Sequence, residues 1–302
     1  MKLVTYKKQD KNSIGFLIND SVVDLSAAAE YAASRTGAAA AVSYPSDMVE
    51  LLEREMLDAA HSLHETFQKQ SEWVSEIGVP VAEVELLAPL RKPGKVICIG
   101  LNYMDHAKET GKPIPTAPIV FGKYANSIVG PGSAVNIPPV TDKVDYEAEL
   151  AVVIGKRASR VAADSALGYV AGYMNFNDIS ARDLQMADGQ WMKGKFLDTF
   201  APTGPWLVTK EDIQDPGKLK IELRLNGKTM QSSSTGNLIF SVPTLISFLS
   251  GLLTLEPGDI IATGTPSGVG AAMNPPLFLQ AGDTVEVEVE GLGVLTNPVT
   301  AS

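Results

Sequence analysis

Short apolar runs separated by turn residues dominate the chain, and helical periodicity is confined to a few segments. Residues 15–25 form two apolar runs around Asn19-Asp20, a pair typical of a β-hairpin turn. We therefore expect short strands and turns over residues 1–30. Residues 47–75 instead carry apolar side chains at three- and four-residue spacing, which predicts helix.

The chain beyond residue 94 has the pattern of a strand-rich domain with few helices. Its apolar runs are bounded by Gly and Pro, which interrupt regular structure. The predicted strands are residues 95–100, 118–121, 148–155, 219–225, 259–263 and 284–289. We predict a small amino-terminal α+β domain over residues 1–92 and a larger domain over residues 93–302. The expected fold class is mainly β with α, an α+β protein.

Residues 236–255 need a separate interpretation because they contain no charged residue. A membrane span needs about 20 predominantly apolar residues, whereas this segment contains Asn237, Pro243 and Gly251. We interpret it as the end of a strand followed by a buried helix that Pro243 opens. No membrane association is expected.

Composition narrows the class of protein. The formal net charge of -10 argues against a nucleic-acid-binding surface, which needs clustered Lys and Arg. Cys98 is the single cysteine, so an intrachain disulfide is excluded, and its apolar neighbours predict a buried core residue. The first residues lack the apolar core of a signal peptide, and a cytoplasmic location is expected.

Two acidic residues stand at the start of an apolar strand. Glu147 and Glu149 are two positions apart, so both side chains point to one face of that strand. A solvated strand face is one interpretation of this spacing. The apolar run that follows favours the other, in which both acids face the interior or a cleft and require a cation.

A third acid, Asp178, ends another largely apolar stretch, although taken alone it is more typical of a helix N-cap or a turn. Carboxylate oxygens select Mg²⁺ or Mn²⁺ over zinc. Three carboxylates around a divalent ion leave one negative charge, which a nearby lysine would balance. Lys195 is the candidate, and an ordinary surface lysine is the alternative interpretation of that residue.

Residues 100–109 offer an acid–base pair. Asn102 is expected to cap a short helix, which would put His106 and Glu109 on one face of it. A carboxylate beside a histidine fixes its tautomer and raises its basicity, as a general base requires. An exposed helical pair without a catalytic role has the same spacing. Residues 110–115 would form the hinge of a mobile lid.

Two other motifs carry weaker signals. His61 and His64 lie in the helical segment without a Cys or third His nearby, so solvated histidines are favoured over a zinc site. Residues 261–270 form a glycine-rich loop without a Walker or dinucleotide-binding fingerprint. Its backbone amides would suit a substrate carboxylate, and a simple tight turn is the alternative. The absence of a Gly-x-Ser-x-Gly elbow argues against serine hydrolase chemistry.

Together and in this order, these motifs resemble those of the fumarylacetoacetate hydrolase family. The resemblance covers roughly residues 95–297, and the amino-terminal part looks like the variable small domain of the same family. It rests on residues 100–106, 145–150, 177–185, 194–199 and 259–266.

The resemblance implies a mixed β-sandwich roll, usually dimeric, that binds Mg²⁺ or Mn²⁺. By motif match, the metal ligands are Glu147, Glu149 and Asp178. By the same match, the catalytic residues are His106, Glu109 and Lys195, and the substrate-contacting residues are Arg182, Gln185 and Thr265. Phe196 departs from the family, which often has Ser there, and the lost hydroxyl would alter water placement or substrate choice.

The family's substrates share a 2-oxo carboxylate, which chelates a metal through its ketone and carboxylate oxygens. The metal then stabilises an enolate when a bond to C3 breaks. The favoured expectation is hydrolysis of an acylpyruvate, with His106 and Glu109 activating water. The alternatives are decarboxylation of oxaloacetate, isomerisation of a dienedioate, and a catalytically silent metal-binding homologue.

Overall fold

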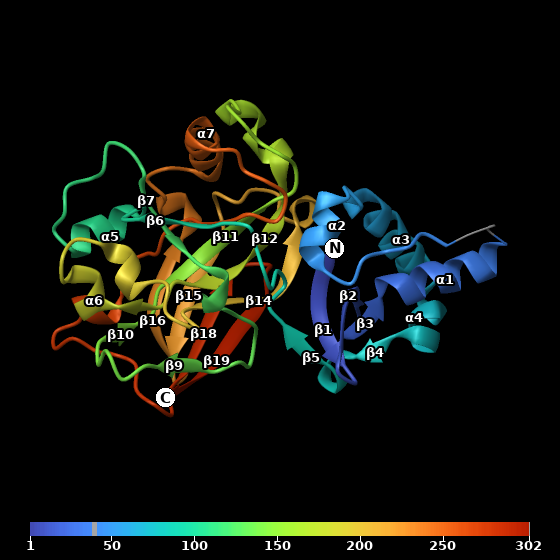
Figure 1. Ribbon diagram of the computed structural model, residues 1–302, viewed down its shortest axis with the longest axis horizontal. Coiled ribbons are helices and arrows are strands. Elements are labelled where there is room, and N and C mark those ends of the chain that lie inside the picture. Colours follow the sequence, from blue (N-terminus) through green and yellow to red (C-terminus); the bar gives the residue numbers. More distant parts are fainter. Residues whose placement is uncertain (38–40, 302) are drawn as a thin grey trace.

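The computed structural model describes residues 1–37 and 41–301, whose helices and strands are drawn in Figure 1. The amino-terminal strands are β1 (Lys2–Lys8), β2 (Lys11–Ile18), β3 (Ser21–Asp24), β4 (Val79–Pro80) and β5 (Glu85–Leu87). The helices among them are α1 (Leu25–Thr36), α2 (Met48–Glu53), α3 (Leu57–Lys69) and α4 (Ser71–Ile77).

Further along the chain, strands outnumber helices. The strands are β6 (Val96–Gly100), β7 (Ile119–Lys123), β8 (Ile128–Val129), β9 (Val135–Ile137), β10 (Val144–Asp145), β11 (Ala148–Ile154), β12 (Val170–Asn177), β13 (Ser180–Ala181), β14 (Ala201–Thr209), β15 (Lys220–Leu225), β16 (Lys228–Ser234), β17 (Ile260–Ala262), β18 (Thr284–Val289) and β19 (Val294–Ala301). The helices are α5 (Met104–Glu109), α6 (Arg182–Met186) and α7 (Val242–Leu252).

The predicted amino-terminal hairpin is confirmed. Strands β2 and β3 pair antiparallel on either side of Asn19 and Asp20. These two residues have positive φ angles of 47° and 61°, the geometry of a type I′ turn, which Asn and Asp tolerate well. The turn chemistry in the sequence therefore determined the strand register here.

The amino-terminal part contains more helix than the sequence pattern predicts. Helix α1 starts at Leu25, where the prediction of strands and turns up to residue 30 was wrong. Its start is fixed by Asp24, whose side chain accepts a hydrogen bond from the backbone N–H of Ala27. The segment 47–75 is helical as predicted, but it is divided among α2, α3 and α4, with one break at Glu55, which has a positive φ of 53°.

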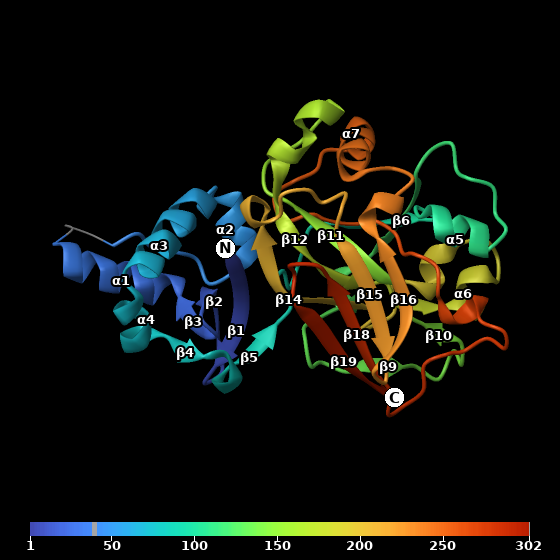
Figure 2. The same ribbon diagram turned by 180° about the vertical axis from the view of Figure 1, so that it is seen from behind.

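Two large sheets carry the fold of the described residues. One has twelve strands, with the order β4-β3-β2-β1-β14-β12-β11-β17-β6-β7 and with β5 and β8 joined to β1 and β14. The other has five, in the order β16-β15-β18-β19-β9. Figures 1 and 2 show the five-stranded sheet in the larger half of the molecule and α1 to α4 in the smaller half. The strand-rich fold class and the six predicted strands are confirmed.

Strand β1 joins the two halves, because it pairs antiparallel with β14 and extends the large sheet. The division into residues 1–92 and 93–302 stays a prediction. The buried helix predicted after residue 242 is α7, with Ser241 as its N-cap and Pro in its first turn. Among the described residues, no helix is both long enough and apolar enough to cross a membrane.

Strand β11 separates two hydrophobic cores. Its side chains at Leu150 and Val152 pack into the core that includes the five-stranded sheet and α7. Ala151 and Val153 point into the second core, which contains Cys98, a buried residue as predicted. Because side chains alternate along a strand, Glu149 belongs to the face of Ala151 and Val153. Core packing on both faces thus fixes the direction in which the Glu149 carboxylate points.

Candidate metal centre and active site

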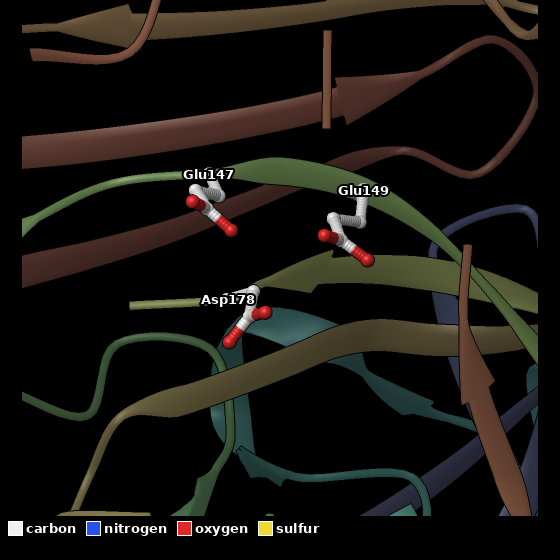
Figure 3. Close-up of side chains that lie close together, drawn as sticks. All are labelled: Glu147, Glu149 and Asp178. Atoms are coloured by element: carbon white, nitrogen blue, oxygen red, sulfur yellow. The ribbon is translucent and has the colours of Figure 1, made fainter. Parts of the chain in front are cut away.

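Three carboxylates converge where β11 begins and β12 ends. Glu147 immediately precedes β11, Glu149 lies within it, and Asp178 follows β12. One carboxylate oxygen of each residue lies within 4.8 Å of the other two, and Figure 3 shows the three side chains grouped together. The strand register explains their proximity, because Ala148 pairs with Asn177 across the two strands. The structure therefore brings the three predicted ligands together.

All three acids are buried, which excludes the solvated strand face for Glu147 and Glu149. Asp178 lies in the connection between β12 and β13 and caps no helix. Burial, and then the charges of Asp178 and Glu147, raise the pKa of Glu149 well above its usual range. Its carboxylate accepts a hydrogen bond from the Gly264 N–H at 2.8 Å. Among the ion pairs of the described residues, none involves Glu149.

Lys195 lies against the cluster rather than on the surface. Its Nζ is 2.8 Å from Glu147 Oε2 and 2.8 Å from Asp178 Oδ2, and the side chain is buried. Burial alone would lower the pKa of Lys195, but Asp178 and Glu147 outweigh that effect and raise it. The lysine is therefore held charged, in the place where the charge of three carboxylates needs balancing.

Arg182 connects Glu147 to a fourth buried acid. Its Nη1 is 2.7 Å from Glu147 Oε1, and its Nη2 is 2.7 Å from Asp145 Oδ2. Burial would raise the pKa of Glu147, yet Lys195 and Arg182 more than compensate and lower it to about 2. Glu147 is thus ionised at neutral pH, and Arg182 is already engaged by protein carboxylates.

The donor set fits a hard divalent cation. It contains carboxylate oxygens alone, which suit Mg²⁺ or Mn²⁺ better than zinc. Glu149 is a buried carboxylate whose raised pKa comes from burial and from its two acidic neighbours, and a bound cation would compensate both. Glu147, Glu149 and Asp178 are accordingly the residues that would hold such an ion.

His106 and Glu109 face this cluster from the short helix α5. Nδ1 of His106 is 2.9 Å from Glu109 Oε2, and Oε1 of Glu109 accepts the backbone N–H of Gly268 at 2.8 Å. The helix is therefore tied to the glycine-rich loop through Glu109. The predicted Asn102 cap was wrong. Tyr103 takes the N-cap position, and the Asn102 amide instead donates to the carbonyl oxygens of Phe240 and Thr263.

The glycine-rich loop uses its amides differently from the expectation. Besides Gly264 and Gly268, the N–H groups of Gly270 and Ala271 donate to Asp145 at 2.8 and 3.0 Å. These amides bind carboxylates of the protein itself, so they are not free to bind a substrate carboxylate. These hydrogen bonds fix the acids and helix α5 around the site.

One cavity of about 380 Å³ unites the candidate residues. Of the predicted site residues, eight line it: His106, Glu109, Glu147, Glu149, Arg182, Gln185, Lys195 and Thr265. Asp178 lies just behind, within 4.8 Å of the two glutamates. Apolar walls come from Phe121, Met186 and Trp191. The cavity therefore combines charged groups with apolar walls, as a small organic acid would require.

Gln185 and Thr265 each have a partner that orients them. The Gln185 Oε1 accepts from Arg182 Nη1 at 3.0 Å, and the Thr265 hydroxyl accepts from Gln231 Nε2 at 2.8 Å. Phe196, the departure from the family pattern, stacks on Tyr124 with ring centroids 5.5 Å apart. Its ring thus packs against another aromatic ring and is absent from the cavity lining.

Sequence reasoning missed two buried residues that build the site. Lys123 ends the apolar strand β7, and its Nζ lies 2.8 Å from Asp178 Oδ1 and donates to the backbone carbonyl oxygens of Ile179 and Phe200. The Asp145 carboxylate forms an ion pair with Arg182 and accepts a hydrogen bond from the Gly270 N–H of the glycine-rich loop. A charged residue closing an apolar strand was the available signal for Lys123. Asp145 stood inside a recognised motif without an assigned role.

The two histidines of α3 lie far from these carboxylates in the chain and belong to a different part of the fold. His61 Nε2 is 3.1 Å from the Thr209 hydroxyl and 3.3 Å from Glu211 Oε2. His64 is buried against Phe16. In the part of the chain that the structure describes, these histidines do not belong to a group of three or more possible metal ligands. His64 is a core residue, contrary to the expectation that both histidines are solvated.

Fold and site together define the class of protein: mixed β-sheets that support a candidate divalent-metal centre, with a His–Glu pair from helix α5 lining the same cavity. The comparison with protein families agrees with this class. Residues 95–300 match the family model described as fumarylacetoacetate (FAA) hydrolase C-terminal. The chain belongs to the fumarylacetoacetate hydrolase family, and it is an enzyme of that family.

Individual relatives place the chain more closely. It is 50% identical over 223 residues to oxaloacetate tautomerase FAHD2A, mitochondrial, of Bos taurus. The aligned region covers 73% of this chain and 71% of the bovine protein. The solved fumarylacetoacetate hydrolase of Exiguobacterium antarcticum is similar with a TM-score of 0.81 and 34% identity, over the full length of both chains. Maleylpyruvate hydrolase of Sphingobium sp. SYK-6, solved with manganese(II) and pyruvate, gives a TM-score of 0.74 at 28% identity, again over both full chains.

Proposed function

We propose that this chain catalyses keto–enol tautomerisation of a 2-oxo acid of the oxaloacetate type, with a divalent metal ion. The main observation that supports this proposal is that the His106–Glu109 pair and the carboxylate cluster line one cavity. Tautomerisation needs a proton acceptor at C3 and stabilisation of negative charge at the C2 oxygen. The identity to an oxaloacetate tautomerase supports this choice of reaction.

The residues of the chain divide this task. The Glu109 contact at Nδ1 favours the His106 tautomer with a proton on Nδ1, so the lone pair of Nε2 is free to accept the C3 proton. The same nitrogen would return a proton to the C2 oxygen or to C3. The Gly268 N–H fixes Glu109 and hence the imidazole ring.

The other side of the cavity would hold the 2-oxo carboxylate. We propose Glu147, Glu149 and Asp178 as the metal ligands, and Mg²⁺ or Mn²⁺ as the ion. The bound ion would act as a Lewis acid on the 2-oxo group. Lys195 contacts and aligns Glu147 and Asp178, while Arg182, Gln185 and Thr265 would contact the substrate.

A second candidate function is hydrolysis of an acylpyruvate, the reaction that the sequence favours. The same His106–Glu109 pair would then activate water against the distal carbonyl. The similarity to a maleylpyruvate hydrolase supports this alternative. Oxaloacetate decarboxylation and dienedioate isomerisation would use the same enolate without an attacking water.

The test is a panel of reactions with Mg²⁺ or Mn²⁺ and a chelator control. Decay of enol-oxaloacetate is followed by its ultraviolet absorbance, and cleavage of acetylpyruvate and of fumarylpyruvate and decarboxylation of oxaloacetate are followed by pyruvate release. We expect metal-dependent tautomerisation, reduced by about 10²- to 10⁴-fold in His106→Asn. His61→Asn, which changes a histidine outside the cavity, should retain the wild-type rate.

Failure of the metal-loaded wild type to accelerate any of these reactions would refute the proposal and favour a catalytically silent homologue. Faster cleavage of an acylpyruvate than tautomerisation would favour the second candidate. Equal tautomerisation rates in wild type and His106→Asn would remove His106 from the mechanism.

Oligomeric state and location are separate proposals. We propose a homodimer, supported by the family resemblance, which light scattering on the purified protein would test. We propose a cytoplasmic location, which cell fractionation would test. The bovine relative is mitochondrial by name, so fractionation should include mitochondria where the source cell has them.

A further inference from the structure

The cavity contains one lysine for which the proposed chemistry has no use. Lys112 lines the same cavity as the carboxylate cluster and follows helix α5, and the Trp191 and Phe121 rings lie between its ammonium group and that of Lys195. Arg182 is paired with Asp145 and Glu147, and Lys195 with Glu147 and Asp178. In the described ranges 1–37 and 41–301, no ion pair involves Lys112. It is thus a lysine of the cavity whose charge is available to a ligand.

The backbone of Lys112 is held in a defined place. Helix α5 ends in a Schellman motif, in which the Lys112 N–H donates to the Ala107 carbonyl at 3.2 Å and the Gly111 N–H to the Lys108 carbonyl at 3.2 Å. Gly111 supplies the positive φ of 64° that this helix end requires. Lys112 therefore follows the lid helix directly, with its position set by the helix end.

Its ammonium group is oriented by an aromatic ring. Nζ of Lys112 lies over the Trp191 ring, 5.5 Å from the centroid, and Trp191 itself packs edge-on against Phe121. Gly100 makes room for this ring, because a Cβ there would lie 2.5 Å from Trp191 Cζ3. The charge thus stands at the apolar wall of the cavity, where a cation–π contact orients it without neutralising it.

We propose that Lys112 binds a second, distal carboxylate of the substrate, so that the cavity selects 2-oxo dicarboxylates over 2-oxo monocarboxylates. This inference rests on the proposed function and deepens it by naming the residue that would recognise the second carboxylate of an oxaloacetate-type substrate. A 2-oxo acid whose 2-oxo carboxylate lies at the Glu147–Glu149 cluster would extend along the apolar wall. A carboxylate at its far end would meet the ammonium group over Trp191.

The experiment compares two ligands that differ in the distal group alone. Oxaloacetate carries a carboxylate where 2-oxobutanoate carries a methyl group. Dissociation constants for both are measured by calorimetry on the Mn²⁺-loaded wild type and on Lys112→Met, Lys112→Arg and Lys108→Met. Lys108 is the matched control, because it is an exposed lysine of helix α5, four residues before Lys112, that is absent from the cavity lining.

We expect the wild type to prefer oxaloacetate by about 10- to 100-fold, the range of a hydrogen bond to a charged group. Lys112→Met should lose most of that preference through weaker oxaloacetate binding, with 2-oxobutanoate unchanged. Lys112→Arg should keep it, and Lys108→Met should match the wild type. In turnover, Lys112→Met should raise KM for oxaloacetate and leave kcat within a few-fold.

Three results would overturn the inference: no preference in the wild type, an unchanged preference in Lys112→Met, or equal weakening of both ligands in that variant, which would indicate a structural role in the lid. The outcome is separable from that of the proposed function. A wild type that shows the Lys112-dependent preference without accelerating tautomerisation refutes the reaction and supports the binding assignment.

Discussion

Replacement of Glu149 by Gln is expected to increase the stability of the metal-free protein and to decrease its affinity for a metal ion. Two unit charges 4.8 Å apart repel by about 3.5 kcal/mol at an effective dielectric constant of about 20. Glu149 faces two such charges, Glu147 and Asp178, and Lys195 offsets part of this repulsion. The amide oxygen of the introduced glutamine would still accept the Gly264 N–H. We therefore expect the metal-free Glu149→Gln protein to be more stable than metal-free wild type by about 2 kcal/mol.

The sign of the pH dependence follows from the raised pKa of Glu149. In metal-free wild type the folded state holds this proton more tightly than the unfolded state, so stability falls as pH rises above the ordinary Glu pKa of about 4.3. The advantage of Glu149→Gln should therefore be present at neutral pH and disappear in acid, where Glu149 is protonated in both states.

A divalent ion should reverse the order of the two proteins. An ion at 100 times its dissociation constant stabilises the folded state by about 2.7 kcal/mol. For a chain of this size, that raises Tm by about 4 °C. The variant should lose most of this shift, because it lacks one charged ligand.

The assay is thermal denaturation with a chelator and then with increasing Mg²⁺ or Mn²⁺. Glu53→Gln is the matched control, because Glu53 is an exposed glutamate at the end of α2. Equal ion-induced shifts in wild type and Glu149→Gln would refute the metal assignment. A less stable metal-free variant would refute the electrostatic argument.

Three further outcomes are expected. Lys195→Met should destabilise the metal-free protein by about 2–3 kcal/mol in chemical denaturation, because Glu147 and Asp178 each lose one of two cationic partners, and added Mg²⁺ should restore part of the loss. Gly268→Ala should lower the free energy of unfolding by about 2 kcal/mol or more and should lower kcat. The reason is that Gly268 has a φ of +101° and that a Cβ there would lie 2.1 Å from a backbone carbonyl oxygen, beside the contact with Glu109. Gly251→Ala, in open space on α7, is the control and should fold normally. Burial lowers the pKa of His64 to about 4, so the free energy of unfolding should fall by up to about 3 kcal/mol as pH drops from about 6.5 to 4. His64→Phe should lack this part of the pH dependence when its unfolding is measured against pH.

Local sequence patterns determined much of the fold. Turn chemistry at Asn19 and Asp20 and the apolar runs of β6, β11 and β15 predicted these elements, because hairpin turns and buried strands depend on residues close in the chain. Helix α1 was missed because its Ala-rich face follows directly on a strand and an Asp cap, where strand and helix signals overlap. The two breaks in residues 47–75 depend on packing that no short pattern contains.

The candidate site shows the same division. Spacing alone put Glu147 and Glu149 on one face, and the motifs supplied Asp178, His106 and Lys195 as candidates. The tertiary structure decided that all of these groups meet in one place, because β11 and β12 pair in a particular register and the glycine-rich loop folds back onto the acids.

The structure alone identified Lys123, Asp145 and Lys112. Lys123 and Asp145 contact partners dozens of residues away, and Lys112 is defined by its distance from Trp191 and by the lack of a carboxylate partner in the described chain. A sequence specifies which side chains are charged and on which face of an element they lie. Which charges neutralise each other, and which remain available to a ligand, depends on distances and burial that arise only when distant strands and loops pack together.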